Sequence, residues 1–218
     1  MSNVNLTLEQ KLMIGFLVKV AIPLKYYDNK KSNRIKDAIW RAHRDVLTGR
    51  RLGGSVFEDY VERTKGGFDN DNSPLKKLYD CITDCKSRNC SLTSKCLFEI
   101  LAADFSQSDY GALQKLVNMT LKYFILLKEF ENADVPEVNY QACHCPLDSN
   151  IIKSVSKTYQ NYKGIRWTLD LDQKNPNNKN ECYYESIQND ISTLLKDETD
   201  TAPFGNLTYD FLHWKSEK

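Results

Sequence analysis

The chain has 218 residues, 41% hydrophobic and 27% charged, with a net charge of +1. This balance is typical of one globular domain and excludes a disordered or low-complexity protein. No apolar run reaches the ~18 residues that suggest a membrane span, so we expect no membrane partner. Polar residues precede the first apolar stretch, which argues against a signal peptide.

Basic residues are concentrated near the start of the chain. Residues 19–65 hold twelve Lys or Arg and six Asp or Glu, a local charge of +6 that leaves −5 for the remainder. Such a segment is compatible with a phosphate-bearing partner. Solvated helix faces would give the same pattern.

Helices are predicted nearly throughout the first half of the chain. Cap residues and apolar spacing predict helices that begin at Thr7, Ser32, Ser55, Ser73 and Ser91. Glycines or a proline follow the first three of these segments and end them.

The second half is organised around an apolar segment from Tyr110 to Phe130. Its apolar residues cover more than one face, so we expect a mostly buried helix. Further helices are predicted over Ser149–Tyr162 and Glu181–Lys196, with a last turn or helix over Tyr209–Trp214. The Asn-rich stretch Asp172–Asn180 is predicted to be an irregular linker.

The chain shows no period-2 strand and no internal repeat. The predicted fold class is therefore all-α, a compact multi-helix orthogonal bundle. We expect a single domain over 1–218, with possible sub-lobes 1–105 and 106–218.

Seven cysteines are present, four of them spaced C-x3-C-x4-C-x5-C over residues 81–96. Zinc sites usually show repeated C-x2-C pairs, which this run lacks. The odd count argues against a complete disulfide framework and favours free thiols in a reducing cytoplasm. A zinc-stapled interaction domain on these four cysteines is the alternative.

Two residues at helix starts carry the strongest chemical signal. Lys115 lies in the first turns of the central helix, and Asp148 precedes the next predicted helix. The intervening chain is long enough to return, so both side chains can meet. An amine beside a carboxylate suits attack on a carbon that bears a leaving group. Ordinary first-turn and N-cap roles would explain the same residues.

Gly111-Ala-Leu-Gln-Lys115 and Pro146-Leu-Asp148 resemble two motifs of the helix-hairpin-helix DNA glycosylase superfamily. The first is similar to the end of the hairpin that carries a catalytic lysine, and the second to the motif that supplies an essential aspartate. The spacing between lysine and aspartate is closest to the archaeal 8-oxoguanine DNA glycosylase branch. Related uncharacterised bacterial and phage proteins share the order of these motifs.

The resemblance implies an intracellular, monomeric DNA glycosylase, with or without lyase activity, that excises a damaged or modified base. Lys115 would be the nucleophile and Asp148 would stabilise the sugar cation. The expected substrate-binding residues are Gln114, Asn118, His144 and Trp167. The expected contacts to the DNA backbone are Gly111, Lys36, Arg41, Arg44, Arg50 and Arg51.

Leu113 stands where the family's hairpin has its second glycine, which weakens the expected phosphate contact. The iron–sulfur members have a four-cysteine pattern near the C-terminus that this chain lacks, so no cofactor and no metal are expected. The alternative function is a non-catalytic binding protein on a glycosylase-like helical fold. Its ligand would be a nucleotide, a nucleic acid or a protein.

Overall fold

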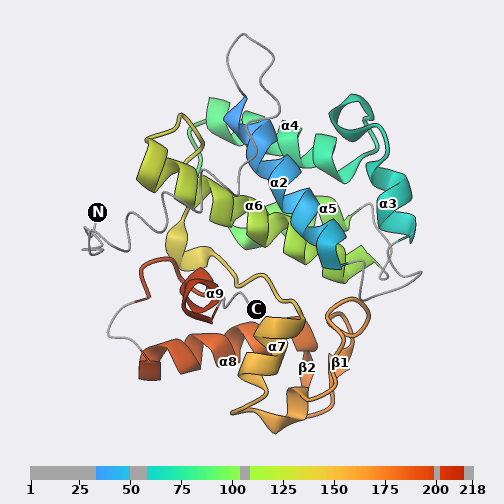
Figure 1. Ribbon diagram of the computed structural model, residues 1–218, viewed down its shortest axis with the longest axis vertical. Helices are drawn as coiled ribbons and strands as arrows, with labels where there is room; N and C mark the ends of the chain where they lie inside the picture. The colour runs from blue at the N-terminus through green and yellow to red at the C-terminus, as the bar shows by residue number, and fades with distance from the viewer. Residues whose placement is uncertain (1–32, 50–57, 104–108, 199–201, 214–218) are drawn as a thin grey trace.

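The computed structural model describes residues 33–49, 58–103, 109–198 and 202–213. The helix predicted from Thr7 lies outside this part of the chain. The described chain is mostly helical, as predicted, and Figure 1 shows helices α2–α6 above a second group that contains α7–α9 and one short hairpin.

Within the described residues, four helices precede the central one, and each begins one to three residues after its predicted start. They are α2 (Arg34–Gly49), α3 (Glu58–Thr64), α4 (Pro74–Ser87) and α5 (Ser94–Ala102). Helix α2 buries Ile35, Ile39, Ala42 and Val46, whose spacing of three to four residues places them on one face. At α4, the Ser73 hydroxyl accepts a hydrogen bond from the backbone N–H of Leu75.

Helix α6 (Tyr110–Glu131) is almost entirely buried, as predicted from its apolar faces. It packs against α2 and α5. Helix α6 comes after the expected sub-lobe boundary at residue 105, yet it packs with the helices that come before that boundary.

Helix α5 begins at Ser94, three residues after the predicted start at Ser91, and its N-cap residue is Thr93. The backbone of Leu92 pairs with residues 137–139, donating to the carbonyl of Glu137 and accepting from the N–H of Asn139. Because Leu92 is held in this bridge, the helix cannot extend back to Ser91.

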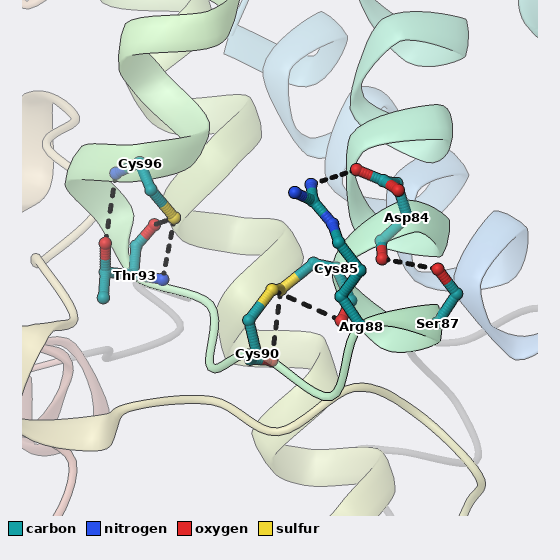
Figure 2. The surroundings of a disulfide bond; sticks show 7 residues. All are labelled: Asp84, Cys85, Ser87, Arg88, Cys90, Thr93 and Cys96. Carbon is teal, nitrogen blue, oxygen red and sulfur yellow. Dashed lines mark hydrogen bonds and ion pairs between the residues drawn. A yellow bond between two sulfur atoms is a disulfide. The ribbon is translucent and has the colours of Figure 1, made fainter.

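A disulfide joins Cys85, in the last turn of α4, to Cys90 in the following turn (Figure 2). The prediction of free thiols is wrong for this pair, because the turn after α4 brings the two residues together. It holds for the other five cysteines, which are free. The disulfide also removes two of the four ligands that the zinc alternative requires. The described residues contain no group of three or more His, Cys, Asp or Glu that could hold a metal ion.

The second group contains α7 (Ser149–Val155), α8 (Tyr183–Glu198) and α9 (Leu207–His213), which contact one another. Helix α7 is shorter than predicted. It ends at Val155, and turns with a single 3-10 turn over Gln160–Tyr162 replace its predicted second half.

The prediction of an irregular linker over Asp172–Asn180 is wrong. Lys174–Asn175 (β1) and Asn178–Cys182 (β2) form an antiparallel hairpin. Its strands are too short and too polar to show alternation in the sequence. The pairing continues as Tyr184 donates its N–H to the carbonyl of Leu171, which brings the chain before β1 against the start of α8.

None of the described helices is long and apolar enough to cross a membrane.

Candidate active site

Lys115 and Asp148 meet, as predicted from their places at two helix starts. The Nζ atom of Lys115 lies 3.2 Å from Oδ2 of Asp148. The Lys115 side chain is 10% exposed and that of Asp148 is 28% exposed. The amine is therefore nearly buried, and the carboxylate forms the solvent-facing side of the pair.

The two oxygens of Asp148 have separate partners. Oδ1 accepts hydrogen bonds from the backbone N–H groups of Asn150 and Ile151, at 3.0 and 3.1 Å, and so caps α7. Oδ2 faces Lys115. A carboxylate at a helix N-terminus is stabilised as the anion. The cap thus fixes the carboxylate while leaving one oxygen directed at the amine.

Trp167 lies over the amine rather than at an open rim. Its ring centre is 5.0 Å from Nζ of Lys115, a cation–π distance, and the residue is buried. The Lys115 amine is therefore held between a carboxylate and an aromatic face. Whether Trp167 also contacts substrate stays a prediction.

Gly111 explains how Trp167 comes so close to α6. A Cβ atom built on Gly111 would lie 2.1 Å from the carbonyl oxygen of Trp167. The absence of a side chain lets this backbone pack directly on the first turn of the helix. Gly111 is buried beneath the chain around Trp167, and the DNA contact expected at this residue stays a prediction.

Gln114 holds the loop that carries Asp148. Its side-chain nitrogen donates to the carbonyl of Leu147 at 2.7 Å, and its side-chain oxygen accepts from the N–H of Leu147 at 3.1 Å. Gln114 is fully buried. The structure thus gives Gln114 a positioning contact to the residue before Asp148, and its substrate contact stays a prediction.

Asn118 and His144 meet at the hydroxyl of Tyr184. Asn118 Nδ2 donates to this hydroxyl at 3.0 Å, and Nδ1 of His144 lies 2.9 Å from it. A hydroxyl that accepts from Asn118 still has its own proton, which it can donate to Nδ1 of His144 when the ring carries its proton on Nε2. Burial lowers the pKa of His144, which agrees with a neutral ring.

Residues of the second group, which sequence reasoning missed, complete this arrangement. Gln188 of α8 binds the backbone of Cys145 in the way that Gln114 binds the backbone of Leu147. Its side-chain oxygen accepts from the N–H of Cys145 at 2.9 Å, and its side-chain nitrogen donates to the carbonyl of Cys145 at 2.7 Å. The loop before Asp148 is thus bound by a glutamine from α6 and another from α8. Gln188 belongs to no recognisable motif, so no signal in the chain could have identified it.

A second buried ion pair lies on the same face of α6. Lys122 pairs with Asp210 of α9, and both side chains are less than a tenth exposed. At about 100° per residue, Gln114, Lys115, Asn118 and Lys122 occupy one arc of roughly 100°. We call these four residues the polar seam of α6. It joins the central helix to the loop before α7 and to α9.

The predicted DNA-backbone contacts in α2 are mostly engaged within the protein. Lys36 lies over the ring of Tyr79 at 5.0 Å, and Arg41 pairs with Asp45 at 3.3 Å. Arg44 is exposed. The remaining two predicted contacts, Arg50 and Arg51, lie outside the described residues.

Comparisons with protein-family models, curated proteins and solved structures found no match to this chain.

Proposed function

We propose that the protein is a base-excising DNA glycosylase with lyase activity, in which Lys115 is the nucleophile. One observation carries the proposal: the Lys115 amine lies 3.2 Å from Asp148 Oδ2 and beneath the Trp167 ring. The same two residues are those that the resemblance to helix-hairpin-helix glycosylases selects. Their meeting supports the proposal because either residue alone would be an ordinary helix-start residue.

The first step needs a neutral amine. Asp148 Oδ2 is within hydrogen-bond reach of the Lys115 ammonium and accepts its proton, while Oδ1 remains bound to the start of α7. The amine then attacks C1′ of the deoxyribose and forms a C–N bond. The N-glycosidic bond breaks, and the base leaves with the bonding electron pair and takes up the proton that Asp148 accepted. The Asp148 carboxylate, anionic again, stabilises the positive charge that develops on the sugar.

The second step opens the sugar ring. The attached nitrogen first gives one proton to the Asp148 carboxylate. Its lone pair then forms a C=N bond to C1′, and the ring oxygen leaves and takes up that proton, which gives a protonated Schiff base on Lys115. Loss of a proton from C2′ then expels the 3′ phosphate by β-elimination. Water hydrolyses the Schiff base and restores the amine.

Borohydride trapping tests the proposal. The protein is incubated with duplexes that carry 8-oxoguanine, other modified bases or an abasic site, and imines are reduced to stable adducts. We expect an adduct with the full chain and none with Lys115→Gln. Asp148→Asn should slow the reaction by about 10²–10⁴-fold, the usual contribution of a proton-transfer group. Absence of both base release and adduct across the panel would overturn the proposal.

The polar seam supplies a matched control. Lys122 is a second buried lysine of α6 paired with an aspartate, but its partner belongs to α9. Lys122→Gln should lower stability and leave the adduct at temperatures where the protein is folded. If Lys115→Gln retains full trapping, Lys115 is not the nucleophile even if activity exists.

The same control observation favours one alternative. Lys122 and Asp210 form a buried ion pair whose carboxylate is not exposed, so this pair joins α6 to α9 and has no access to a substrate. A Lys–Asp pair on the polar seam can therefore have a purely structural role. If Lys115 and Asp148 do only that, the protein is a binding protein with a helical fold. Lys115→Gln and Lys122→Gln would then lower stability alike, and neither would affect any chemistry.

A further inference from the structure

Within the described part of the chain, three lysines that come after Asp148 lack the carboxylate partners that most basic residues of the first helices have. In residues 34–103, most described Lys and Arg side chains pair with a carboxylate: Arg34, Arg41, Arg63, Lys65, Lys76, Lys86, Arg88 and Lys95. By contrast, Lys153, Lys157 and Lys163 form no ion pair with any described residue, and all three are exposed. We call these three residues the lysine patch.

The lysine patch belongs to a locally positive segment. Residues 149–174 contain five Lys or Arg and two Asp or Glu, a charge of +3. Asp170, one of the two acids, is bound to Arg166 through both of its oxygens. Asp172 is the other acid, and Asp190 and Asp197 of α8 act electrostatically on Tyr159, but none of these carboxylates forms an ion pair with a lysine of the patch. This is the opposite of residues 34–103, where paired charges cancel.

The segment that carries the patch also builds the candidate active site. Asp148 caps α7, and Lys153 lies five residues later, about 7.5 Å along the helix axis. After Lys163 the chain turns at Gly164, where φ is +89° and a Cβ would meet no atom within 4 Å, and it then reaches Trp167. In Figure 1, α7 lies in the lower group, away from the middle of α2.

Hydrogen bonds fix the patch relative to the site. The turn after α7 continues through Tyr159, whose N–H donates to the carbonyl of Val155, and the 3-10 turn closes as the N–H of Lys163 donates to the carbonyl of Gln160. The side chain of Tyr162 is buried beneath it. The three lysines thus project from an ordered surface whose ends are Asp148 and Trp167.

The helix dipole of α7 stabilises the charge of only one of the three lysines. Lys153 lies in the last turn of α7, where a cation is favoured by the helix dipole. Lys157 and Lys163 lie beyond the helix end, and this stabilisation falls off within the last turn. All three are exposed, so an external anion can reach each of them.

We infer that the lysine patch binds the phosphate backbone of DNA on the strand whose sugar reaches Lys115 and Asp148, in place of the α2 residues selected from the sequence. Phosphates recur about every 3.4 Å of helix axis on one strand. A distance of about 7.5 Å along α7 therefore corresponds to roughly two nucleotide steps. The identity of the anion as DNA rests on the proposed function, whereas the location of the contact rests on the unpaired lysines.

The salt dependence of binding tests this inference. Affinity for a short fluorescein-labelled duplex with a tetrahydrofuran abasic-site analogue is measured by anisotropy between about 50 and 200 mM salt. The variant Lys153→Gln/Lys157→Gln/Lys163→Gln should lose about 2.7 from the slope of log K against log salt, because each phosphate contact contributes about 0.9. A matched control, Lys76→Gln/Arg88→Gln/Lys95→Gln, removes the same charge from residues paired with acids and should leave the slope unchanged.

The outcomes separate the surface from the chemistry. An unchanged slope in the lysine-patch variant, or an equal loss in the control variant, overturns the inference. So does the absence of duplex binding by the unaltered protein at low salt, or tighter binding to phosphatidylserine vesicles than to duplex. Borohydride trapping at saturating protein reports the chemistry independently: the patch variant should still form the Lys115 adduct. An adduct together with an unchanged slope would leave the proposed function standing without this surface.

Discussion

Replacing Gly111 by alanine tests the contact that places Trp167 over the Lys115 amine. In an isolated helix this change would be stabilising by about 1 kcal/mol, because glycine is a poor helix former. In this structure the new Cβ would lie 2.1 Å from the carbonyl oxygen of Trp167, which is 1.3 Å closer than the 3.4 Å where ordinary contact begins. Helix propensity therefore predicts that Gly111→Ala raises the free energy of unfolding, whereas tertiary packing predicts that it lowers it.

The magnitude follows from what the new methyl group meets. Its nearest atoms are the backbone of Trp167 and Thr168, which cannot rotate away as a side-chain tip would. Overpacking costs about 1–3 kcal/mol, and rigid neighbours favour the upper value. After subtraction of the propensity gain we expect a net loss of about 2 kcal/mol in the free energy of unfolding. For a chain of this size that corresponds to a fall in Tm of roughly 4–8 °C.

Urea and thermal unfolding of Gly111→Ala provide the assay, with Gly164→Ala as the control. Gly164 has a positive φ, but a Cβ there would meet no atom within 4 Å. It should lose only the backbone strain, about 1–2 kcal/mol, and keep the Lys115 adduct. Gly111→Ala should also weaken the adduct, because the Trp167 segment must move away from α6. Unchanged or increased stability of Gly111→Ala would refute the close approach of this segment to the helix.

Three further results are expected. Lys122→Met should cost about 3–5 kcal/mol, because it leaves Asp210 charged and buried, whereas Lys122→Met/Asp210→Leu should recover most of that loss in urea unfolding; equal losses would show that the two residues are not coupled. Gln188→Leu should cost about 3 kcal/mol, because it leaves the N–H of Cys145 without its partner and the Cys145 carbonyl with only the 3.5 Å contact from Asn118; a cost no larger than that of a surface substitution would contradict the contact. Burial lowers the pKa of His43 from 6.5 to about 4. Since the folded pKa is the lower one, protonation of His43 favours the unfolded state. The free energy of unfolding should therefore be highest above pH 6.5 and fall by about 3 kcal/mol as pH falls from 6.5 toward 4. In His43→Gln most of this pH dependence should be lost, and an unchanged pH dependence would exclude His43 as its source.

Local sequence signals predicted the helix starts of this protein well. Ser73 before a proline, the apolar run from Tyr110 and the aspartate before Ser149 each specify a helix start through interactions within about four residues. Such signals are complete in the sequence because donor and acceptor are close along the chain. The meeting of Lys115 and Asp148 could be predicted because each residue was fixed at a helix start and the connection was long enough to return.

The tertiary structure alone decided what surrounds that pair. Gln114 and Asn118 were expected to face a substrate, but residues 33 and 66 positions away occupy their side chains. Gln188 and the Lys122–Asp210 pair gave no signal, since a buried polar residue is indistinguishable in sequence from an exposed one until its partner is known. The hairpin before α8 and the disulfide after α4 likewise depend on chain direction at turns. Local chemistry thus determined where the candidate catalytic residues begin their helices, and long-range packing determined which neighbours hold them there.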